Sequence, residues 1–387
     1  MKEQNNAWPI ITKEEAIEIS KLLTKRELSV SAGKGIIGEF EKNFADYNKT
    51  KYVLAQNNGT STLHAAFFAL GLKSGDEILV PSYTWHASIT PALHIGLRPV
   101  FCDIDKETLN IDAKDLYSRI TSRTKAIVIV HLWGLPVDMD PIIKIAKENN
   151  LYIIEDCSHA AGAEYKSKKV GTFGDIACFS MQASKPLVAG EGGIFATNDQ
   201  QFYERAILLG HPSRLKNTSF KKYGNCSLGW KYRANPLSIA IANVQLKYLD
   251  KRNQITRKNM RYLTKGLAEI KGLVLPFESK ISRRIYYSYR LQYDKQIIGK
   301  SKYQLIDHLQ KKGLKAEDED FTLLHKSRLF LDYPAFFDYL KELPDNYQLP
   351  TAESVYPKLM SLPVVHSENK DVLDKLINLI HEFTKNA

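Results

Sequence analysis

The 387-residue chain has few of the features that mark membrane, secreted or low-complexity proteins. Its longest apolar run, residues 126–137, is interrupted by His131 and is shorter than the roughly 20 residues that a membrane-spanning helix needs. Residues 1–6 contain no apolar signal region, which predicts a cytoplasmic protein. The 4 cysteines form no C-x-x-C pair, which indicates reduced thiols rather than a disulfide framework or a zinc knuckle. With 21 Gly and 15 Pro, the composition also excludes collagen-like and disordered chains.

The charge is basic, because 54 Lys and Arg residues exceed 43 Asp and Glu residues and leave a formal net charge of +11. Such an excess is typical of proteins that bind nucleic acid, an anionic membrane or a phosphorylated small molecule. The cations are scattered, however, and the densest stretches, residues 205–222 and 247–257, contain no zinc-finger spacing and no aromatic-interleaved RNA motif. We therefore predict a mildly basic surface with no nucleic-acid partner and no membrane partner.

Short β-branched runs alternate with helical stretches between residues 51 and 197. This alternation is typical of an α/β fold. The predicted strands are residues 52–55, 77–80, 99–103, 126–131, 151–155, 176–180 and 193–197. The predicted helices are residues 60–70, 84–94 and 141–149, followed by a long amphipathic helix over residues 236–267. The pattern predicts a large domain with a mostly parallel seven-stranded sheet flanked by helices.

The last third of the chain has a different pattern. A strand-like stretch over residues 286–293 is mixed with helical stretches over residues 302–311, 352–359 and 370–385. We therefore expect a smaller C-terminal α+β domain over residues 269–387. The large domain, with an N-terminal arm, would then cover residues 1–268.

Candidate ligand-binding residues follow several of the predicted strands, at the edge where an open parallel sheet binds its ligand. After the first strand, Asn58 can cap a helix whose first residues, Gly59, Thr60 and Ser61, offer N–H groups and hydroxyls to an anion. The segment matches neither the dinucleotide-binding glycine pattern nor the Walker pattern. Taken alone, a capping turn of this kind is more often structural than phosphate-binding.

An aromatic residue and a carboxylate follow two further strands. Trp85 offers a flat face for a planar ring, although packing in the core is the commoner role of a lone Trp. Asp156 ends an apolar strand and His159 follows three residues later, so the carboxylate needs a cation or hydrogen-bond donors nearby. A simple turn-capping Asp remains an alternative. A metal site would need two further ligands, and we predict none.

Lys185 follows the predicted strand over residues 176–180 and precedes a glycine-rich loop, residues 190–193. Most lysines are solvated surface cations. This position would place the amine in the ligand cleft, where it can form a Schiff base with an aldehyde. A phosphate cup, a stacking aromatic, a carboxylate and a lysine are together what pyridoxal 5'-phosphate (PLP) requires.

Four motifs resemble the DegT/DnrJ/EryC1/StrS family of sugar aminotransferases, within the aspartate aminotransferase (fold type I) superfamily. They are N-G-T-x-T-L-H-A at residues 58–65, P-x-x-T-W at 81–85, E-D-x-S-H-A at 155–160, and F-S-x-x-x-S-K at 179–185 followed by G-E-G-G at 190–193. The resemblance covers nearly the whole chain, from residue 8 to residue 363.

The resemblance implies a role for each motif residue. Lys185 would hold the cofactor as a Schiff base and later move a proton between the amino-bearing carbon and the cofactor. Asp156 would keep the pyridine nitrogen protonated, His159 would lie beside the ring hydroxyl, and Trp85 would stack on the ring. The implied phosphate ligands are Gly59, Thr60, Ser61 and Ser180.

The family is dimeric, and the resemblance implies that residues 228–236 of one chain complete the pocket of its neighbour. Many members carry Asn where this chain has Lys231, and a cation at that position remains suited to the cofactor phosphate. Arg214, Arg233 and His325 are further candidates for contacts with a phosphorylated acceptor. Each of them could equally be a surface or interface cation.

The implied activity is a transaminase (EC 2.6.1 type) that works by a ping-pong mechanism. An amino acid, most often L-glutamate in the family, would convert PLP to pyridoxamine 5'-phosphate, and a nucleotide-linked keto sugar would take the amine. Dehydratases of the family carry histidine in place of the lysine, so Lys185 favours transamination.

Two alternatives stay open, and a third is set aside because the segment at residues 103–105 is taken as a strand-end turn. The acceptor could be a keto-cyclitol or a free keto sugar acid, or the chain could be a binding or regulatory protein without turnover. A glycosyltransferase with an Asp-x-Asp manganese site at Asp103 and Asp105 is the third. That alternative explains neither the lysine nor the glycine loop.

Overall fold

The computed structural model describes residues 8–30, 33–332, 336–337 and 348–385. The strands of its central sheet are β1 (Tyr52–Gln56), β2 (Glu77–Pro81), β3 (Arg98–Cys102), β4 (Thr124–Val130), β5 (Tyr152–Asp156), β8 (Ile176–Ser180) and β9 (Gly193–Thr197). Their order is β1-β9-β8-β5-β4-β2-β3. Strand β9 is antiparallel to β1 and β8, and the remaining neighbours are parallel. The predicted α/β class with a mostly parallel seven-stranded sheet is confirmed.

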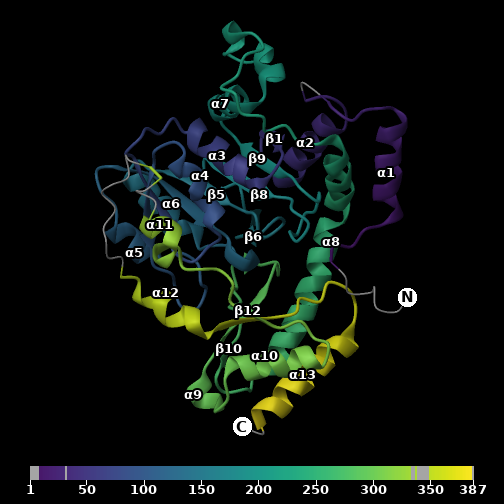
Figure 1. Ribbon diagram of the computed structural model, residues 1–387, viewed down its shortest axis with the longest axis vertical. Helices are drawn as coiled ribbons and strands as arrows, with labels where there is room; N and C mark the ends of the chain where they lie inside the picture. Colours follow the sequence, from purple (N-terminus) through teal and green to yellow (C-terminus); the bar gives the residue numbers. More distant parts are fainter. Residues whose placement is uncertain (1–7, 31–32, 333–335, 338–347, 386–387) are drawn as a thin grey trace.

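Helices cover both faces of the central sheet (Figure 1). One face packs against α3 (Gly59–Ala69), α4 (Thr90–Leu93) and α7 (Gln200–Gly210). The other packs against α2 (Gly35–Asn48), α5 (Ala113–Ser118), α6 (Met139–Glu148) and the first half of α8 (Pro236–Leu267). Burial on both faces explains why these strands are almost uniformly apolar rather than alternating. The N-terminal helix α1 (Lys13–Thr24) lies against α8.

The C-terminal part has its own sheet and core. Its four-stranded sheet has the order β10-β12-β14-β13, with β10 (Leu273–Val274), β12 (Tyr289–Tyr293), β13 (Glu317–Asp318) and β14 (Leu359–Leu362). The helices around this core are α9 (Lys295–Ile298), α10 (Lys302–Lys311) and α13 (Lys370–Lys385), whereas α11 (Arg328–Asp332) and α12 (Pro350–Val355) pack into the core of the central sheet. The second half of α8 contributes Met260, Leu263 and Leu267 to this core. A domain boundary near residue 269 remains our proposal.

A third, three-stranded sheet joins the two parts of the molecule. It consists of β11 (Ser282–Arg283), β6 (Glu164–Tyr165) and β7 (Lys168–Lys169). No helix in the described part of the chain is long and apolar enough to cross a bilayer.

Two predicted helices are wrong in extent, and proline explains both. The predicted helix over residues 84–94 is a 3-10 turn, His86–Ser88, followed by the single turn of α4. Pro91 lies near the start of α4, where its missing N–H costs nothing, whereas the interior of a longer helix would lose a hydrogen bond there. The predicted helix over residues 352–359 ends at Val355, and Pro357 lies in the following 3-10 turn.

Arg214 pairs within the framework of the fold, and its contact with a substrate stays a prediction. Its Nη1 and Nη2 donate to Glu41 Oε2 and Oε1 at 3.0 and 2.8 Å. The Ala55 N–H donates to the same carboxylate at 2.8 Å. Burial opposes the charge, yet the Glu41 carboxylate raises the pKa of Arg214. This pair joins α2 and β1 to the segment after α7.

We expect Arg214→Ala to lower the free energy of unfolding by about 3–5 kcal/mol, because it leaves the buried Glu41 carboxylate without a cation. Arg328→Ala is the matched control, since it removes an arginine from a surface pair with Asp332 in which the Arg side chain is 84% exposed. That variant should lose less than about 1 kcal/mol. Urea unfolding measures both. Equal losses in the two variants would contradict the framework role.

Candidate active site

A cavity of about 430 Å³ opens at the carboxyl ends of the parallel strands. It is lined by seven of the residues predicted from the sequence as cofactor ligands: Gly59, Thr60, Trp85, Asp156, His159, Ser180 and Lys185. They come from four separate segments of the chain between residues 59 and 185. The fold therefore brings the motif residues to one place.

The start of α3 forms an anion cradle on one side of the cavity. Asn58 caps the helix, and its Oδ1 accepts the Ser61 N–H at 2.7 Å. Ser61 is thus used in the cap and lies outside the cavity lining, whereas Gly59 and Thr60 line it. N–H groups in the first turn of a helix have no partner within the helix and attract anions.

The cradle also requires glycine for steric reasons. A Cβ atom at Gly59 would lie 2.8 Å from Ser180 Cβ, and one at Gly193 would lie 2.1 Å from the Asn58 carbonyl oxygen. The start of α3 therefore approaches β8 and β9 more closely than any side chain would allow. A phosphate group fits such a cradle.

Asp156 ends β5 with only 4% of its surface exposed. Its Oδ2 accepts a hydrogen bond from Ser88 Oγ at 2.7 Å, and its Oδ1 accepts one from the Ser158 N–H at 3.0 Å. The Thr84 hydroxyl lies 3.1 Å from Ser88 Oγ. Each carboxylate oxygen has one donor and keeps further acceptor capacity, which suits a protonated ring nitrogen. Ser88 was not predicted, because only the tertiary fold brings it next to Asp156.

His159 lies in a stack of aromatic rings beside the cavity. Its ring centroid is 4.2 Å from that of Tyr287 and 5.2 Å from that of Trp133, with interplanar angles of 21° and 14°. Burial, together with the charges of Lys185 and Arg290, holds the pKa of His159 well below its usual range, so the imidazole is neutral. Its buried Nδ1 has no hydrogen-bond partner among the described residues, and a polar group on a bound ligand would satisfy it.

Lys185 is half-buried on the cavity wall. Its Nζ donates to Tyr287 Oη at 3.2 Å and lies 4.4 Å from the centroid of the same ring. Trp85 is 48% exposed at the mouth of the cavity, where its ring is 5.4 Å from that of Phe321. Tyr287 and Trp133 were missed because they carry no motif and come from distant segments.

Three other predicted residues lie away from the cavity lining. Lys231 and Arg233 are exposed in the segment between α7 and α8, which stands out at the top of Figure 1. His325 is buried, and its Nδ1 and Nε2 lie 2.6 Å from Ser82 Oγ and 3.0 Å from Glu353 Oε1. Both ring nitrogens thus have partners, after β2 and on α12, and a substrate contact by His325 stays a prediction.

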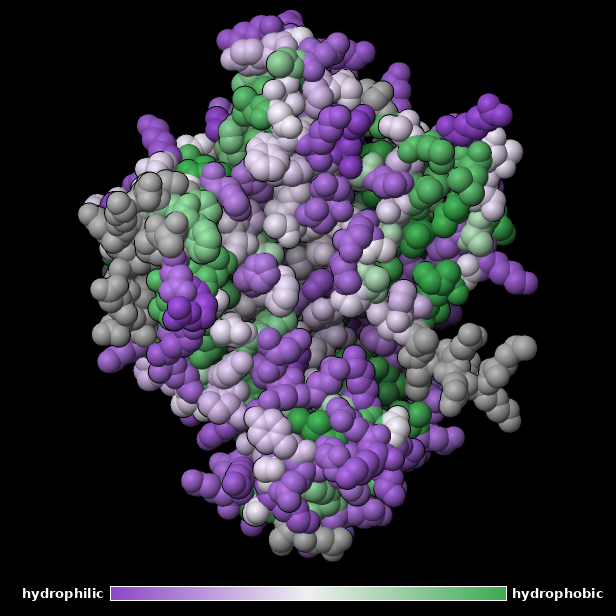
Figure 2. Space-filling view, in the orientation of Figure 1, coloured by the Kyte–Doolittle hydropathy of each residue, from purple (hydrophilic) through white to green (hydrophobic). Residues whose placement is uncertain are grey.

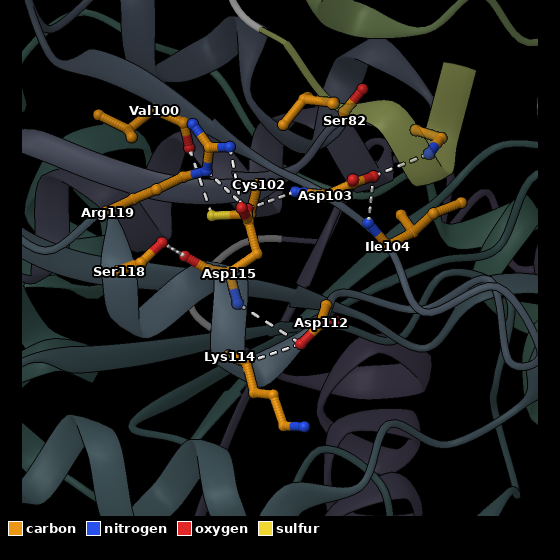
Figure 3. Close-up of polar contacts among 12 residues, drawn as sticks. Ser82, Val100, Cys102, Asp103, Ile104, Asp112, Lys114, Asp115, Ser118 and Arg119 are labelled. Carbon is orange, nitrogen blue, oxygen red and sulfur yellow. Dashed lines mark hydrogen bonds and ion pairs between the residues drawn. The ribbon is translucent and has the colours of Figure 1, made fainter. Parts of the chain in front are cut away.

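The carboxylates of Asp103 and Asp105 are both engaged within the protein, and Figure 3 shows Asp103 with its hydrogen bonds. Asp103 accepts the N–H groups of Thr351 and Ala352, at the start of α12, at 2.9 and 2.8 Å. Asp105 Oδ1 accepts the Thr108 N–H at 2.8 Å. The bonds of Asp103 connect the end of β3 to the C-terminal part. Because both carboxylates already accept internal hydrogen bonds, an Asp-x-Asp manganese site does not fit.

In the described part of the chain, one buried group, His131, Glu155 and Cys157, has the proximity of metal ligands. The Val137 N–H donates to His131 Nδ1 at 3.1 Å, so His131 Nε2 carries a proton and donates to Glu155 at 3.0 Å. Burial raises the pKa of the Cys157 thiol well above its usual range, so the thiol stays protonated. Because His131 and Glu155 are bonded to each other and a protonated thiol does not ligate a metal, this group is not a suitable metal site.

Comparison with known proteins identifies the family of the chain. The chain matches the DegT/DnrJ/EryC1/StrS aminotransferase family over residues 9–381. GDP-perosamine synthase of Escherichia coli O157:H7 is 40% identical over 221 residues, which are 57% of this chain and 60% of that protein. The spore coat polysaccharide biosynthesis protein SpsC of Bacillus subtilis is 33% identical over 392 residues, covering 98% of this chain and 96% of that protein.

A solved structure has the same fold. The GDP-4-keto-6-deoxy-D-mannose-3-dehydratase of E. coli, with bound hydrated PLP, superimposes with a TM-score of 0.84 at 25% identity and covers 97% of this chain and 99% of that one. The architecture is that of the fold type I PLP enzymes. On its sequence, its fold and the composition of its cavity, the chain belongs to the DegT/DnrJ/EryC1/StrS aminotransferase family.

Proposed function

We propose that the protein transfers an amino group from an amino acid, L-glutamate in the first instance, to a nucleotide-linked keto sugar, with PLP as its cofactor. The observation that carries the proposal is that Lys185 and Asp156 line one cavity together with the anion cradle at the start of α3. Family membership supports transamination, and the PLP in the dehydratase of the same fold supports the cofactor.

The cavity fits PLP at each of its polar groups. The cradle of Gly59 and Thr60 suits the phosphate, and the buried Asp156 carboxylate suits the ring nitrogen. The unpartnered Nδ1 of His159 suits the ring hydroxyl. The Lys185 amine suits the aldehyde. A site that served only binding would not need both the lysine and the carboxylate.

Bound PLP supplies an electron sink that allows an amino group to be exchanged for a keto oxygen. The residues of this chain would then divide the work. Asp156 keeps a proton on the ring nitrogen and so maintains the sink, while Ser88 and Ser158 orient its carboxylate. Lys185 moves the proton at the amino-bearing carbon. Trp85, at the mouth of the cavity, would offer its flat face to the ring.

The nature of the acceptor is proposed from relatives. The names of the GDP-perosamine synthase and the GDP-sugar dehydratase both specify a sugar linked to a nucleoside diphosphate. Binding energy from such a distal group can orient the keto carbon toward Lys185 without taking part in the chemistry.

A direct test is to incubate the PLP-loaded protein with isotope-labelled L-glutamate and a panel of nucleotide-linked keto sugars, and to detect labelled amino sugar by mass spectrometry. We expect one member of the panel to be aminated. Lys185→Ala should lower kcat by at least about a thousandfold, because it removes the proton-transferring amine. Lys144→Ala, at an exposed position on α6, is the matched control and should retain full activity. Turnover by Lys185→Ala at the wild-type rate would exclude the assigned role.

Asp156→Asn should lower kcat by roughly a thousandfold, because an amide cannot hold the ring nitrogen in its protonated form. Ser88→Ala should cost about tenfold in kcat, since it removes one hydrogen bond to the carboxylate. Ser118→Ala removes a serine hydroxyl bonded to the Asp115 carbonyl, away from the cavity, and should be neutral. Steady-state kinetics of the three variants measure whether the losses in kcat follow this order. A neutral Ser88→Ala variant would show that Ser88 does not support Asp156.

We also propose a homodimer in which Lys231 reaches the cofactor phosphate of the neighbouring chain. The projecting segment between α7 and α8 carries Leu228 and Trp230 at 54% and 49% exposure, as expected of an interface. Figure 2 shows a further group of hydrophobic side chains over α1, where Ile17 and Leu23 are 53% and 51% exposed.

Light scattering should therefore give twice the mass of the chain, and Trp230→Asp should shift the equilibrium toward monomer, because it places a charge in an apolar contact. Lys231→Ala should weaken PLP binding by about tenfold, through loss of a cation near the phosphate. Lys221→Ala, exposed in the same segment, is its control. A fully active monomer would contradict the shared site.

A further inference from the structure

Tyr287 is the residue of the cavity wall that touches the amine of Lys185. It lies between β11 and β12, in the C-terminal part of the chain, whereas Lys185 lies in the loop between β8 and β9. Besides the 3.2 Å contact with Lys185 Nζ, its Oη lies 3.1 Å from Ser184 Oγ. The phenol therefore meets two consecutive residues of the loop that carries the amine.

The directions of these hydrogen bonds follow from the number of protons available. Ser184 Oγ donates its single proton to Gln182 Oε1 at 2.6 Å. Ser184 Oγ must then accept a hydrogen bond from the Tyr287 hydroxyl. The lone pairs of Tyr287 Oη remain free to accept a hydrogen bond from Lys185 Nζ. The result is a directed chain from Lys185 to Tyr287, then to Ser184 and to Gln182.

The ring of Tyr287 is held in place independently of these bonds. It stacks on His159 at 4.2 Å and lies nearly parallel to Trp133, at 5.9 Å and 9°. Trp133 is held in turn by the Arg290 guanidinium, 4.4 Å from its ring centroid, and by a hydrogen bond from its Nε1 to Tyr83 Oη at 3.2 Å. An oxygen on so constrained a ring has a defined position in the cavity.

We propose that Tyr287 is a positioning residue for Lys185, whose phenol oxygen fixes where the ε-amine lies whenever that amine is free to move protons. A flexible lysine side chain loses much conformational entropy when it is held in one place, and a preformed acceptor reduces the cost of reaching the reactive arrangement. The inference rests on the proposed function only in taking Lys185 as the reacting amine. Packing alone would need the ring but not its hydroxyl.

Tyr287→Phe separates positioning from packing, because it keeps the ring stack and removes only Oη. In the PLP-loaded enzyme we expect kcat to fall by about 10- to 100-fold, while KM for the acceptor changes by less than about threefold. Tyr289→Phe is the matched control, since its hydroxyl bonds Thr264 Oγ1 at 2.9 Å, away from Lys185. It should leave kcat unchanged. A Tyr287→Phe enzyme with the wild-type kcat would overturn the proposal.

A second measurement needs neither cofactor nor turnover. Cofactor-free protein is treated with a limiting amount of acetic anhydride at one pH, and acetylation of Lys185 is followed by peptide mass spectrometry. We expect Lys185 to react about three to ten times faster in Tyr287→Phe, because the phenol oxygen no longer holds the amine in one place and the amine can turn toward the reagent. Tyr289→Phe should react like the wild type. An unchanged rate of Lys185 acetylation in Tyr287→Phe would show that the phenol does not hold the amine in place.

The two measurements distinguish the two proposals. Faster acetylation of Lys185 without amination of any acceptor would retain the positioning contact and reject the proposed function. If Tyr287→Phe melts well below the wild type, Ser184→Ala replaces it as the test, because it removes only the acceptor of the phenol proton at an exposed position. It should change acetylation in the same direction by a smaller factor, and no change would count against the proposal.

Discussion

The carboxylate of Asp156 is the constraint on which the rest of the site depends. A carboxylate that is almost fully buried at the end of an apolar strand is costly unless donors and a positive partner surround it. The protein provides Ser88 and Ser158 as donors, and the open cavity next to them leaves room for a cationic ring. The anion cradle of α3 and the amine of Lys185 lie in the same cavity, where a flat phosphorylated aldehyde would connect all three.

The C-terminal part completes this arrangement rather than merely covering it. Asp103, which follows β3, accepts two N–H groups from the start of α12, and Tyr287 Oη accepts a hydrogen bond from Lys185. Arg290 of β12 lies against Trp133, which stacks on His159. Contacts between the two parts therefore determine the positions of groups that line the cavity. Changes far from the cavity, at the start of α12 for example, can act through them.

Charged residues that belong to no motif were the least predictable from the sequence. Arg214 and His325 were predicted as substrate contacts. In the structure, Arg214 pairs with Glu41, and His325 lies between Ser82 and Glu353. A buried cation is stable only next to its counter-charge, and the sequence does not show which acidic residue will be adjacent after folding. The sequence also did not identify three residues that support the site, Ser88, Trp133 and Tyr287. Each of them contacts a partner from another segment of the chain.

The sequence by itself determined the strands of the central sheet and the motif residues that follow them, including Gly59, Asp156 and Lys185. These features are local: apolar runs form strands buried on both faces, and the residue after a parallel strand must lie at the ligand-binding edge. Only the tertiary structure decided which hydrogen bonds orient those residues and which charges are paired internally. Such contacts join segments far apart in the chain, and their geometry exists only when the packing of the whole molecule brings the segments together.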